Sequence, residues 1–278
     1  MTEDLADAAL PAGYVARIHR AEVLETQCPG PGMIRVRFGG PDLRDYPTTG
    51  IGDEYVRMFF PSRPGTEVSL PHITSLRGWE YPDDVEPAPM RVYTIRAHAP
   101  GEVLVDFVVH EGGVAAAWAQ RAQPGQAVGI NPPCGIYGRP ETLTRQILVA
   151  DEPGMPAALR LAELTADTVR TLLLLEVRST AHRLLADTDD VEYRWLDGTG
   201  NGHGASGVLD ALRELAPGDD TYVWVSTEGR TNRAVRRYLR REVGLPADHY
   251  TCVAYWQENR DPEEIDDAVE NLYEDVGL

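Results

Sequence analysis

Six residues in the first half of the chain combine two arginines, a tyrosine and a threonine in one strand-forming run, Arg91 to Arg96. Because successive side chains of a strand alternate between its faces, Arg91 and Tyr93 are expected on the same face. A guanidinium can hold a diphosphate through two charged hydrogen bonds, and a tyrosine ring offers a flat surface for stacking an isoalloxazine. The hydroxyl of Thr94 reaches the N5 edge of such a ring only if the strand twists or the ligand wraps around its end. An amphipathic strand with surface arginines explains the same run equally well.

A glycine pair follows a later strand, where the sequence runs from Asp106 through His110 to Gly113 and then into alanines. A helix that opens at Gly113 offers the unpaired N–H groups of its first turn and the positive end of its dipole, which together attract phosphate. Neighbouring glycines let a diphosphate approach the backbone closely. The residues Ala115 to Ala117 supply no hydroxyl, so binding there would depend on backbone donors and on Arg91. His110 fits a contact with the ligand and a structural role at the strand end equally well.

These runs, in this order, resemble the siderophore-interacting protein family of the ferredoxin-reductase superfamily. The form R-x-Y-T-x-R resembles the superfamily's flavin-binding strand. The segment Asp106–Ala119, with Pro124 and Gly125 after it, resembles the family's DF-x-x-H strand, G-P-A-x-x-W-A helix start and PGD turn. Further similar segments extend the resemblance from Tyr14 to Gln257, and they are Asp53–Pro61, Asp151–Ala157, Val223–Glu228 and Tyr255–Trp256.

The resemblance implies a flavoprotein oxidoreductase of iron acquisition, a ferric-siderophore reductase with FAD as its cofactor. NADH, NADPH or a ferredoxin is the implied electron donor. Siderophores hold Fe(III) with hard oxygen donors, which hold Fe(II) less tightly, so one electron favours release of the metal. Electron transfer is chemistry of the cofactor, so no catalytic acid or base is assigned. The residues expected to bind FAD are Arg91, Val92, Tyr93, Thr94, Asp106, Val108, His110, Gly113, Val114, Ala115 and Ala116.

The chain departs from the family at the expected siderophore pocket, where the family has three basic residues. Arg57 keeps one of them, whereas Cys134 replaces a base in a turn and Gln257 stands where a base follows the terminal Tyr-Trp pair. These three are the expected substrate-binding residues. With two charges missing, an anionic ferric siderophore is expected to bind more weakly, or a neutral one to be preferred. The departures also favour an alternative, a general flavin or NAD(P)H reductase with another acceptor. A non-catalytic siderophore-binding protein without flavin is a third interpretation.

Short strand-forming runs separated by Gly and Pro fill the first half, which predicts an antiparallel barrel. One helix is expected to interrupt it, over Val114–Arg121. The proline-rich stretch Ser62–Pro89 is expected to be a long loop that is functional or mobile. The predicted strands are Val15–Ile18, Met33–Phe38, Tyr55–Phe60, Arg91–Arg96, Val103–Val109 and Ala127–Ile130.

The second half alternates strands with helices, which predicts βαβ units and a parallel sheet. The expected fold is therefore an antiparallel FAD-binding β-barrel over residues 1–140, followed by an α/β nicotinamide-type domain over residues 141–278. The tail Glu258–Leu278 is strongly acidic, with apolar residues at helical spacing, which predicts an acidic helix on the outside. The predicted strands are Gln146–Ala150, Thr171–Val177, Val191–Leu196, Tyr222–Val225 and Tyr250–Tyr255, and helices are expected from Pro156, over Leu209–Leu212 and over Asn232–Val243.

The charge balance argues against several classes of partner. All 26 basic residues are arginine and stand against 44 acids, so the formal charge is −18, and such a field repels nucleic acid and anionic membranes. The longest strongly apolar run, Leu172–Leu175, is too short to span a bilayer. The acidic start Met1–Asp4 lacks the basic character of a signal peptide, so a cytoplasmic location is expected. Cys28, Cys134 and Cys252 are scattered, which predicts reduced thiols and no metal centre.

Two further patterns have a structural and a functional interpretation. Six arginines lie between Arg230 and Arg241, and spacings of three and four place several of them on one helix face. A solvated helix that pairs with the acidic tail is favoured over a docking surface for NADPH phosphate or an acidic ferredoxin. The glycine-rich stretch Gly198–Gly204 lacks the G-x-G-x-x-G register at a first βα turn, so a flexible loop is favoured over a nucleotide site.

Overall fold

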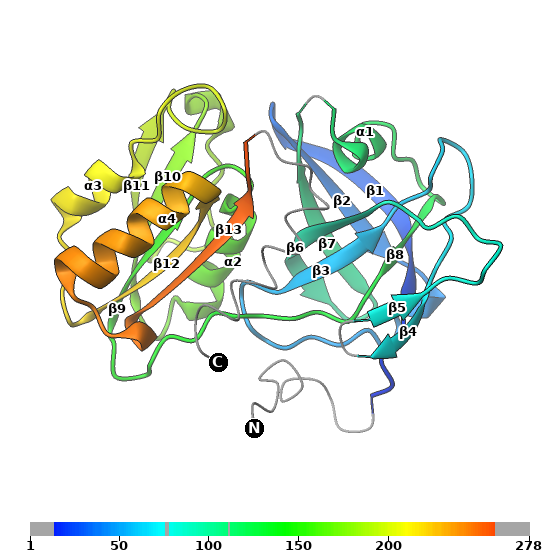
Figure 1. The fold of residues 1–278 in the computed structure, drawn as a ribbon, viewed down its shortest axis with the longest axis horizontal. Coiled ribbons are helices and arrows are strands. Elements are labelled where there is room, and N and C mark those ends of the chain that lie inside the picture. Colours follow the sequence, from blue (N-terminus) through cyan, green and yellow to red (C-terminus); the bar gives the residue numbers. More distant parts are fainter. Residues whose placement is uncertain (1–13, 76–77, 111, 259–278) are drawn as a thin grey trace. The chain divides into compact units, whose positions relative to one another are not determined.

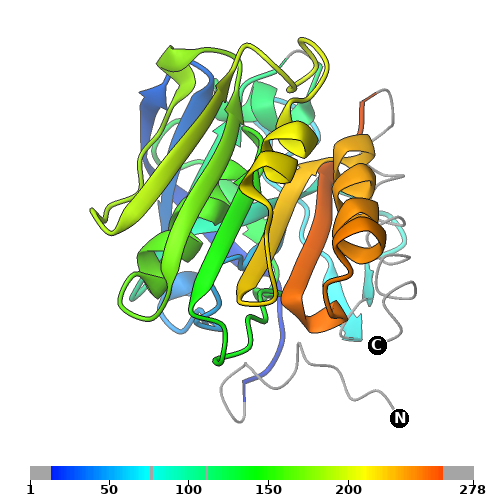
Figure 2. The same cartoon turned by 90° about the vertical axis from the view of Figure 1, so that its left-hand side faces the viewer.

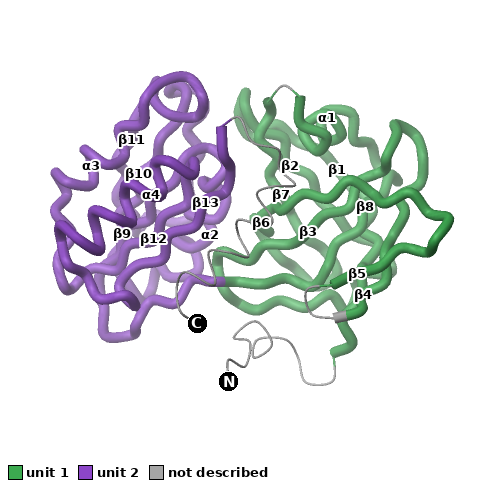
Figure 3. The backbone as a smooth tube through the Cα atoms, in the orientation of Figure 1, with its two compact units in different colours: residues 1–135 green, residues 136–278 purple. Residues whose placement is uncertain are grey.

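The computed structural model describes residues 14–75, 78–110 and 112–258. The chain forms two compact units that divide between Gly135 and Ile136 (Figures 1 and 3), slightly before the boundary predicted at residue 140. The acidic tail helix predicted from Glu258 onward lies outside the described residues, apart from Glu258 itself. Within the described ranges, no helix is long and apolar enough to cross a membrane.

The first unit is built around a closed antiparallel barrel, as predicted from its short strands. The strands follow one another around the barrel in the order β1-β2-β7-β6-β3-β8. Val36, Phe38, Val105 and Ile130 are among the side chains that fill the interior, where inward positions alternate with outward ones. The elements of the barrel are β1 (His19–Gly30), β2 (Met33–Gly39), β3 (Tyr55–Phe59), β6 (Met90–Ala99), β7 (Glu102–Val108), α1 (Val114–Ala119) and β8 (Ala127–Ile130).

The first strand lies later in the chain than predicted. The prediction of a strand over Val15–Ile18 is wrong, because pairing begins only at His19, which lies opposite Ile130 of β8. The buried positions at the start of β1 include His19 and Ala21. A histidine and an alanine thus occupy inward positions where larger apolar residues are usual. The hydrophobic pattern therefore gives only a weak signal for this strand.

The proline-rich segment after β3 contains a small hairpin rather than the continuous loop predicted from its composition. Its strands β4 (His72–Ser75) and β5 (Gly78–Glu80) pair in antiparallel fashion. Trp79 of β5 meets Phe59 of β3 edge-on, with 5.6 Å between the ring centroids. Phe59 belongs to a second, smaller core with Ile18, separate from the barrel interior. This core holds the hairpin against the barrel wall.

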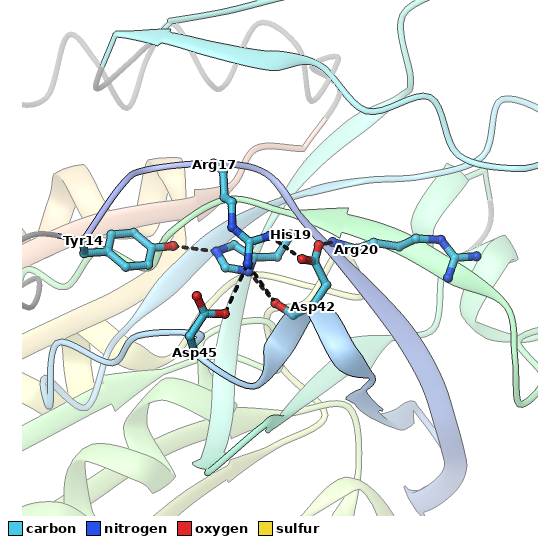
Figure 4. Close-up of polar contacts among 6 residues, drawn as sticks. All are labelled: Tyr14, Arg17, His19, Arg20, Asp42 and Asp45. Carbon is cyan, nitrogen blue, oxygen red and sulfur yellow. Dashed lines mark hydrogen bonds and ion pairs between the residues drawn. The ribbon is translucent and has the colours of Figure 1, made fainter.

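A buried histidine fixes the start of β1 (Figure 4). The Nδ1 of His19 lies 2.7 Å from the backbone carbonyl of Asp42, on the short turn η2 (Pro41–Leu43). Because a carbonyl only accepts, Nδ1 carries the proton, and Nε2 accepts from the hydroxyl of Tyr14 at 2.5 Å. The carboxylate of Asp42 also pairs with Arg17. These contacts tie the segment before β1 to η2.

The second unit is a parallel sheet in the order β11-β10-β9-β12-β13, as predicted for an α/β domain (Figure 2). Helices α3 and α4 pack on one face through Val208, Leu212 and Val235, and α2 packs against β9 and β10. The strand order reverses between β9 and β12, and sheets of this kind bind ligands at the carboxyl ends of the strands next to that point. The elements are β9 (Arg145–Ala150), α2 (Met155–Thr165), β10 (Arg170–Val177), η3 (Thr180–His182), β11 (Val191–Asp197), α3 (Val208–Leu215), β12 (Thr221–Glu228), α4 (Gly229–Arg237), η4 (Tyr238–Val243), η5 (Ala247–His249) and β13 (Tyr250–Trp256).

Candidate functional site

The pairing of β6 with β3 sorts the predicted cofactor residues onto two faces. Tyr93 lies directly opposite Val56, and Arg91 lies directly opposite Met58. Directly opposed side chains share a face of the sheet, and Val56 and Met58 are buried in the barrel core. Tyr93 and Arg91 therefore lie on the inner face of β6, where the Tyr93 ring packs 4.5 Å from that of Phe107. Burial raises the pKa of the Tyr93 hydroxyl, so the phenol stays protonated and can donate a hydrogen bond.

Tyr93 belongs to an aromatic cluster that also anchors the helix predicted to bind phosphate. Trp118 of α1 packs on Phe107, with 5.9 Å between the centroids, and on Phe60, with 5.4 Å. Phe60 in turn meets Tyr93 at 6.4 Å. The packed rings connect β6, β7 and α1. The structure thus brings the predicted stacking residue and the predicted phosphate-binding helix to the same part of the barrel.

The start of α1 presents backbone groups rather than side chains. Gly113 is the N-cap residue, and no side chain of the described residues caps the helix there. A Cβ on Gly113 would collide with the imidazole of His110, so the glycine allows that ring to lie against the backbone. Ala115 and Ala116 are buried, whereas Val114 is partly exposed. The N–H groups of the first turn have no intrahelical acceptor, which suits a phosphate ligand.

The outer face of β6 carries a buried hydroxyl. Thr94 is 6% exposed, and its Oγ1 has no hydrogen-bond partner among the described residues. A buried polar group that is left unpaired costs about 1–3 kcal/mol. This hydroxyl therefore fits a ligand with a complementary polar edge, as a flavin ring has. Val92 lies on the same face and is 42% exposed, which offers an apolar surface beside it.

Arg57 lies on this outer face, directly opposite Val92 in the pairing of β3 with β6. The side chain is largely buried, and its Cζ lies 5.4 Å from the centroid of the Trp79 ring. The backbone N of Arg57 donates to Oδ1 of Asn131 at 2.7 Å, which fixes the strand at this point. Because an arginine stays protonated in proteins, it places a fixed positive charge on the outer face of the barrel.

Cys134 reaches the same face through a single β-bridge. The backbone N of Tyr55 donates to the carbonyl of Cys134 at 2.7 Å, and the N of Cys134 donates to the carbonyl of Tyr55 at 3.0 Å. Tyr55 lies directly opposite Thr94, so both side chains share the outer face with Cys134 and Arg57. Two predicted substrate residues and the predicted flavin-edge residue are thus brought together. Gln257 follows β13 in the second unit.

Two further predicted cofactor residues lie on β7. The side chain of Asp106 is fully buried, and its two oxygens accept hydrogen bonds from Nε and Nη2 of Arg35 at 2.7 and 2.8 Å. Val108 is partly buried at the end of the strand, opposite Met33 of β2. The Asp106 carboxylate is therefore already paired within the barrel. A role at the cofactor stays a prediction for both residues.

Three buried acids line the carboxyl edge of the parallel sheet, and the predicted site includes none of them. Asp151, Glu152 and Glu176 are each no more than 2% exposed. Glu152 pairs with Arg178 at 2.6 Å, and Glu176 accepts a hydrogen bond from Thr199 at 2.7 Å. Acids that directly follow or end buried strands are the signal that could have identified them, because ligands of such sheets bind at this edge.

The glycine-rich stretch Gly198–Gly204 forms a loop, as predicted, and Asn201 ties it to this edge. The Nδ2 of Asn201 donates to the carbonyl of Glu176 at 3.1 Å, and its Oδ1 accepts from the backbone N of Glu152 at 3.0 Å. Gly200 has a positive φ of 60°, and a Cβ there would collide with the Glu176 carboxylate. The loop therefore packs closely over two of the buried acids.

Comparison with known proteins identifies similar chains over most of this length. The model of the siderophore-interacting FAD-binding domain matches residues 22–137, and that of the siderophore-interacting protein matches residues 143–259. The NADPH-dependent ferric-chelate reductase of Escherichia coli (strain K12) is 30% identical over 246 residues, which cover 86% of this chain and 93% of that protein. Ferric vibriobactin reductase ViuB of Vibrio cholerae is 27% identical, over 83% of this chain and 86% of that protein. The crystal structure of a siderophore utilization protein from T. fusca is 26% identical, with a TM-score of 0.75, over 90% of this chain and 96% of that chain.

Proposed function

The chain belongs to the siderophore-interacting protein family, and on that basis we propose that it is an FAD-dependent reductase of ferric siderophores. Each Fe(III) takes up one electron and becomes Fe(II), while the bonds within the siderophore stay unchanged. The oxygen donors of the siderophore hold Fe(II) less tightly, so the metal can leave. The proposed place of the reaction is the cytoplasm, where iron delivered as a chelate would be released.

The placement of Thr94 and Arg57 on one face of the barrel supports this proposal most directly. The two residues lie on neighbouring strands, β6 and β3, and their side chains share the outer face. The unpaired hydroxyl of Thr94 fits the edge of a flavin ring, and the guanidinium of Arg57 can attract an iron chelate. A chelate held at Arg57 would therefore lie beside the flavin edge, which electron transfer requires.

We assign FAD binding to Arg91, Tyr93 and Thr94 of β6 and to the start of α1. Arg91 would supply the charge for the diphosphate, Tyr93 a ring for stacking, and the N–H groups after Gly113 further donors. The guanidinium of Arg91 is close to the backbone, since its Nη1 donates to the carbonyl of Met90 at 2.6 Å. Bound FAD would accept two electrons from the donor and pass them on one at a time.

We propose that the preferred substrate is a neutral or weakly charged ferric chelate. Arg57 supplies a positive charge, whereas Cys134 on the same face is neutral, and so is Gln257. Each missing charge removes an attraction of up to about 1 kcal/mol net at an exposed site, and more where water is excluded. A ferric chelate with a charge of −3 loses most from this change, and a neutral one loses little.

Two kinds of electron donor fit the second unit. A parallel sheet with a switch point between β9 and β12 suits NADH or NADPH, and we propose a nicotinamide as the main donor. A ferredoxin is the second candidate, because α4 and η4 carry an exposed basic surface on a chain with a formal charge of −18. None of the exposed arginines on α4 and η4 forms an ion pair within the described part of the chain. The members of this arginine face are Arg230, Arg233, Arg237, Arg240 and Arg241.

Anaerobic reduction of the FAD-loaded protein tests the proposal. The protein is mixed with NADH, NADPH or reduced ferredoxin, and loss of the oxidised flavin absorbance identifies the donor. A ferric chelate and an Fe(II) trap are then added, and we expect the flavin to reoxidise while trapped Fe(II) accumulates. Reduced flavin that does not react with ferric chelates would instead indicate a general flavin or NAD(P)H reductase. A protein that takes up no FAD and still binds the chelate would be a siderophore-binding protein.

A further inference from the structure

The carboxylate of Asp151 connects the ends of three parallel strands. Asp151 directly follows β9, and its Oδ2 accepts a hydrogen bond from the backbone N of Glu228, the last residue of β12, at 2.8 Å. The same oxygen accepts from the indole Nε1 of Trp256, the last residue of β13, at 2.7 Å. The Oδ1 atom lies 3.4 Å from the backbone N of Gly154, before α2. These contacts gather β9, β12 and β13 at the switch point of the sheet.

The two groups that donate to Oδ2 of Asp151 lie at the start of α4 and next to the expected substrate residue Gln257. Glu228 is the N-cap of α4, and its own carboxylate accepts from the backbone N of Arg230 at 2.6 Å. Trp256 immediately precedes Gln257, which is a proposed substrate residue. Gln257 packs against the start of α4, because a Cβ on Gly229 would lie 2.6 Å from the Gln257 Cγ. The position of Gln257 therefore depends on Trp256 and on the start of α4, the two groups that donate to Oδ2 of Asp151.

We infer that Asp151 is a positioning residue for substrate binding, which holds Trp256 and the start of α4 and thereby orients Gln257. The inference rests on the proposed function, since it assigns Gln257 to the chelate. Asp151 is 1% exposed, so it cannot itself meet a substrate in this arrangement. It acts only through the two residues that donate to its Oδ2.

The charges around Asp151 make its contacts sensitive to pH. No cation pairs with it among the described residues, and the charge of Glu176 on β10 disfavours its ionisation. Glu152, next to it in the chain, is already paired with Arg178, and Glu228 is used in capping α4. Burial is the largest of the effects that raise the pKa of Asp151 to about 7. The charge of Glu176 also raises it but is the smallest effect, and the three N–H groups that donate to Asp151 lower it. Protonation removes the negative charge that strengthens the hydrogen bond from Trp256.

A spectroscopic experiment tests this role without any measurement of activity. Trp256→Phe identifies the Trp256 indole in the ¹H–¹⁵N spectrum of the FAD-loaded protein. We expect this indole N–H resonance to titrate with a midpoint near pH 7 in the wild type and to be independent of pH in Asp151→Asn. Glu152→Gln is the matched control, since it removes a neighbouring buried charge without touching Trp256, and it should keep the titration. A Trp256 indole resonance with the same chemical shift and the same pH dependence in the wild type and in Asp151→Asn would overturn the inference.

Steady-state kinetics then test whether Asp151 affects substrate binding in the reaction. In Asp151→Asn we expect KM for the ferric chelate to rise about fivefold at a pH where the wild-type carboxylate is charged, with a smaller change in kcat. The inflection of kcat/KM near pH 7 should also disappear. Trp256→Phe, which removes the donor and keeps the carboxylate, should raise KM similarly and provides the test if Asp151→Asn folds poorly. Unchanged KM in both variants would overturn the role in substrate binding. A normal indole titration in a protein that reduces no ferric chelate would overturn the proposed function alone.

Discussion

The guanidinium of Arg57 lies over the ring of Trp79, with 5.4 Å between Cζ and the ring centroid. The two residues come from different layers, since Arg57 is on the barrel strand β3 and Trp79 is on the small hairpin outside it. Trp79 is itself held edge-on by Phe59 at 5.6 Å. The hairpin therefore sets the direction in which the proposed substrate-binding charge points.

Removing the Trp79 ring should weaken chelate binding without stopping electron transfer. A cation–π contact contributes about 0.5–2 kcal/mol, so Trp79→Ala should raise KM for the ferric chelate by about 2- to 30-fold. The value of kcat should change less, because the flavin-edge residue Thr94 is not touched. Trp79→Phe keeps an aromatic face and should stay close to the wild type. Steady-state kinetics with an Fe(II) trap measure both, and an unchanged KM in Trp79→Ala would contradict the assignment.

Restoring a charge at Cys134 should change which chelates are bound. Cys134→Arg places a second cation on the face that carries Arg57, so a ferric chelate with a charge of −3 should bind about fivefold more tightly at low salt. A neutral ferric chelate should bind as it does to the wild type. Cys134→Ser is the matched neutral control. Binding is measured by quenching of protein fluorescence at two salt concentrations, and an equal gain for both chelates would argue against a charge effect.

The architecture follows from the sequence because its periodicities are strong. Period-two runs such as Val103–Val109 and the buried strand Gln146–Ala150 each appear as strands close to the predicted bounds. The first strand was misplaced because His19 and Ala21 occupy its inward positions, and hydrophobic periodicity does not identify such residues as core. The hairpin that carries Trp79 was missed because its strands are short and stand among prolines, which favour loops.

The site was only partly predictable for a different reason. Arg91, Tyr93 and Thr94 stand out because their types and spacing suit a flavin nucleotide. The sharing of one face by Thr94 and Arg57 depends instead on the register of β6 with β3, which local sequence does not specify. Its place at the end of a buried strand marks Asp151 as a candidate, but the role proposed for it depends on Glu228 and Trp256, which lie far along the chain.

The start of α1 provides a test of FAD binding. A methyl group on Gly113 would collide with His110 and would also crowd the backbone donors of the first turn. We therefore expect Gly113→Ala to weaken FAD binding by about tenfold, measured by titration of flavin fluorescence. The same change made together with His110→Ala removes the collision within the protein. His110 is itself an expected cofactor residue, so the reference for the double variant is His110→Ala alone. If the double variant binds FAD more weakly than His110→Ala, the methyl group competes with the ligand, as the proposed site requires. Wild-type affinity in Gly113→Ala would exclude this helix start from the cofactor site.

The pair of Asp106 with Arg35 should matter for stability. The Asp106 side chain is fully buried, and removing it leaves a largely buried guanidinium without this partner, which costs about 3 kcal/mol of the free energy of unfolding. Glu102→Ala is the matched control, because Glu102 pairs with Arg37 at 3.2 Å where both side chains are more than a third exposed. That pair should contribute less than about 1 kcal/mol. Urea unfolding of Asp106→Ala and Glu102→Ala measures both, and equal losses would contradict the assignment.

The histidine at the start of β1 should make stability depend on pH. Burial lowers the pKa of His19 below its ordinary value of 6.5. As the pH falls through 6.5, the unfolded chain takes up this proton before the native protein does, so the native state loses stability. The carboxyl of Asp151 acts in the opposite sense, because its raised pKa makes the native state bind the extra proton between its ordinary and its shifted value. The wild-type curve alone therefore does not isolate His19.

A comparison of variants isolates the contribution of His19. His19→Asn should cost stability at about pH 7.5, where the neutral imidazole keeps its bonds to Tyr14 and Asp42. The difference from the wild type should shrink at about pH 5.5, since the variant has no imidazole to protonate. Tyr14→Phe removes one hydrogen bond and keeps the imidazole, so it should cost about 1 kcal/mol and retain the wild-type trend. Chemical unfolding at the two pH values measures these differences. A gap between wild type and His19→Asn that widens as the pH falls would show that His19 is charged in the native protein.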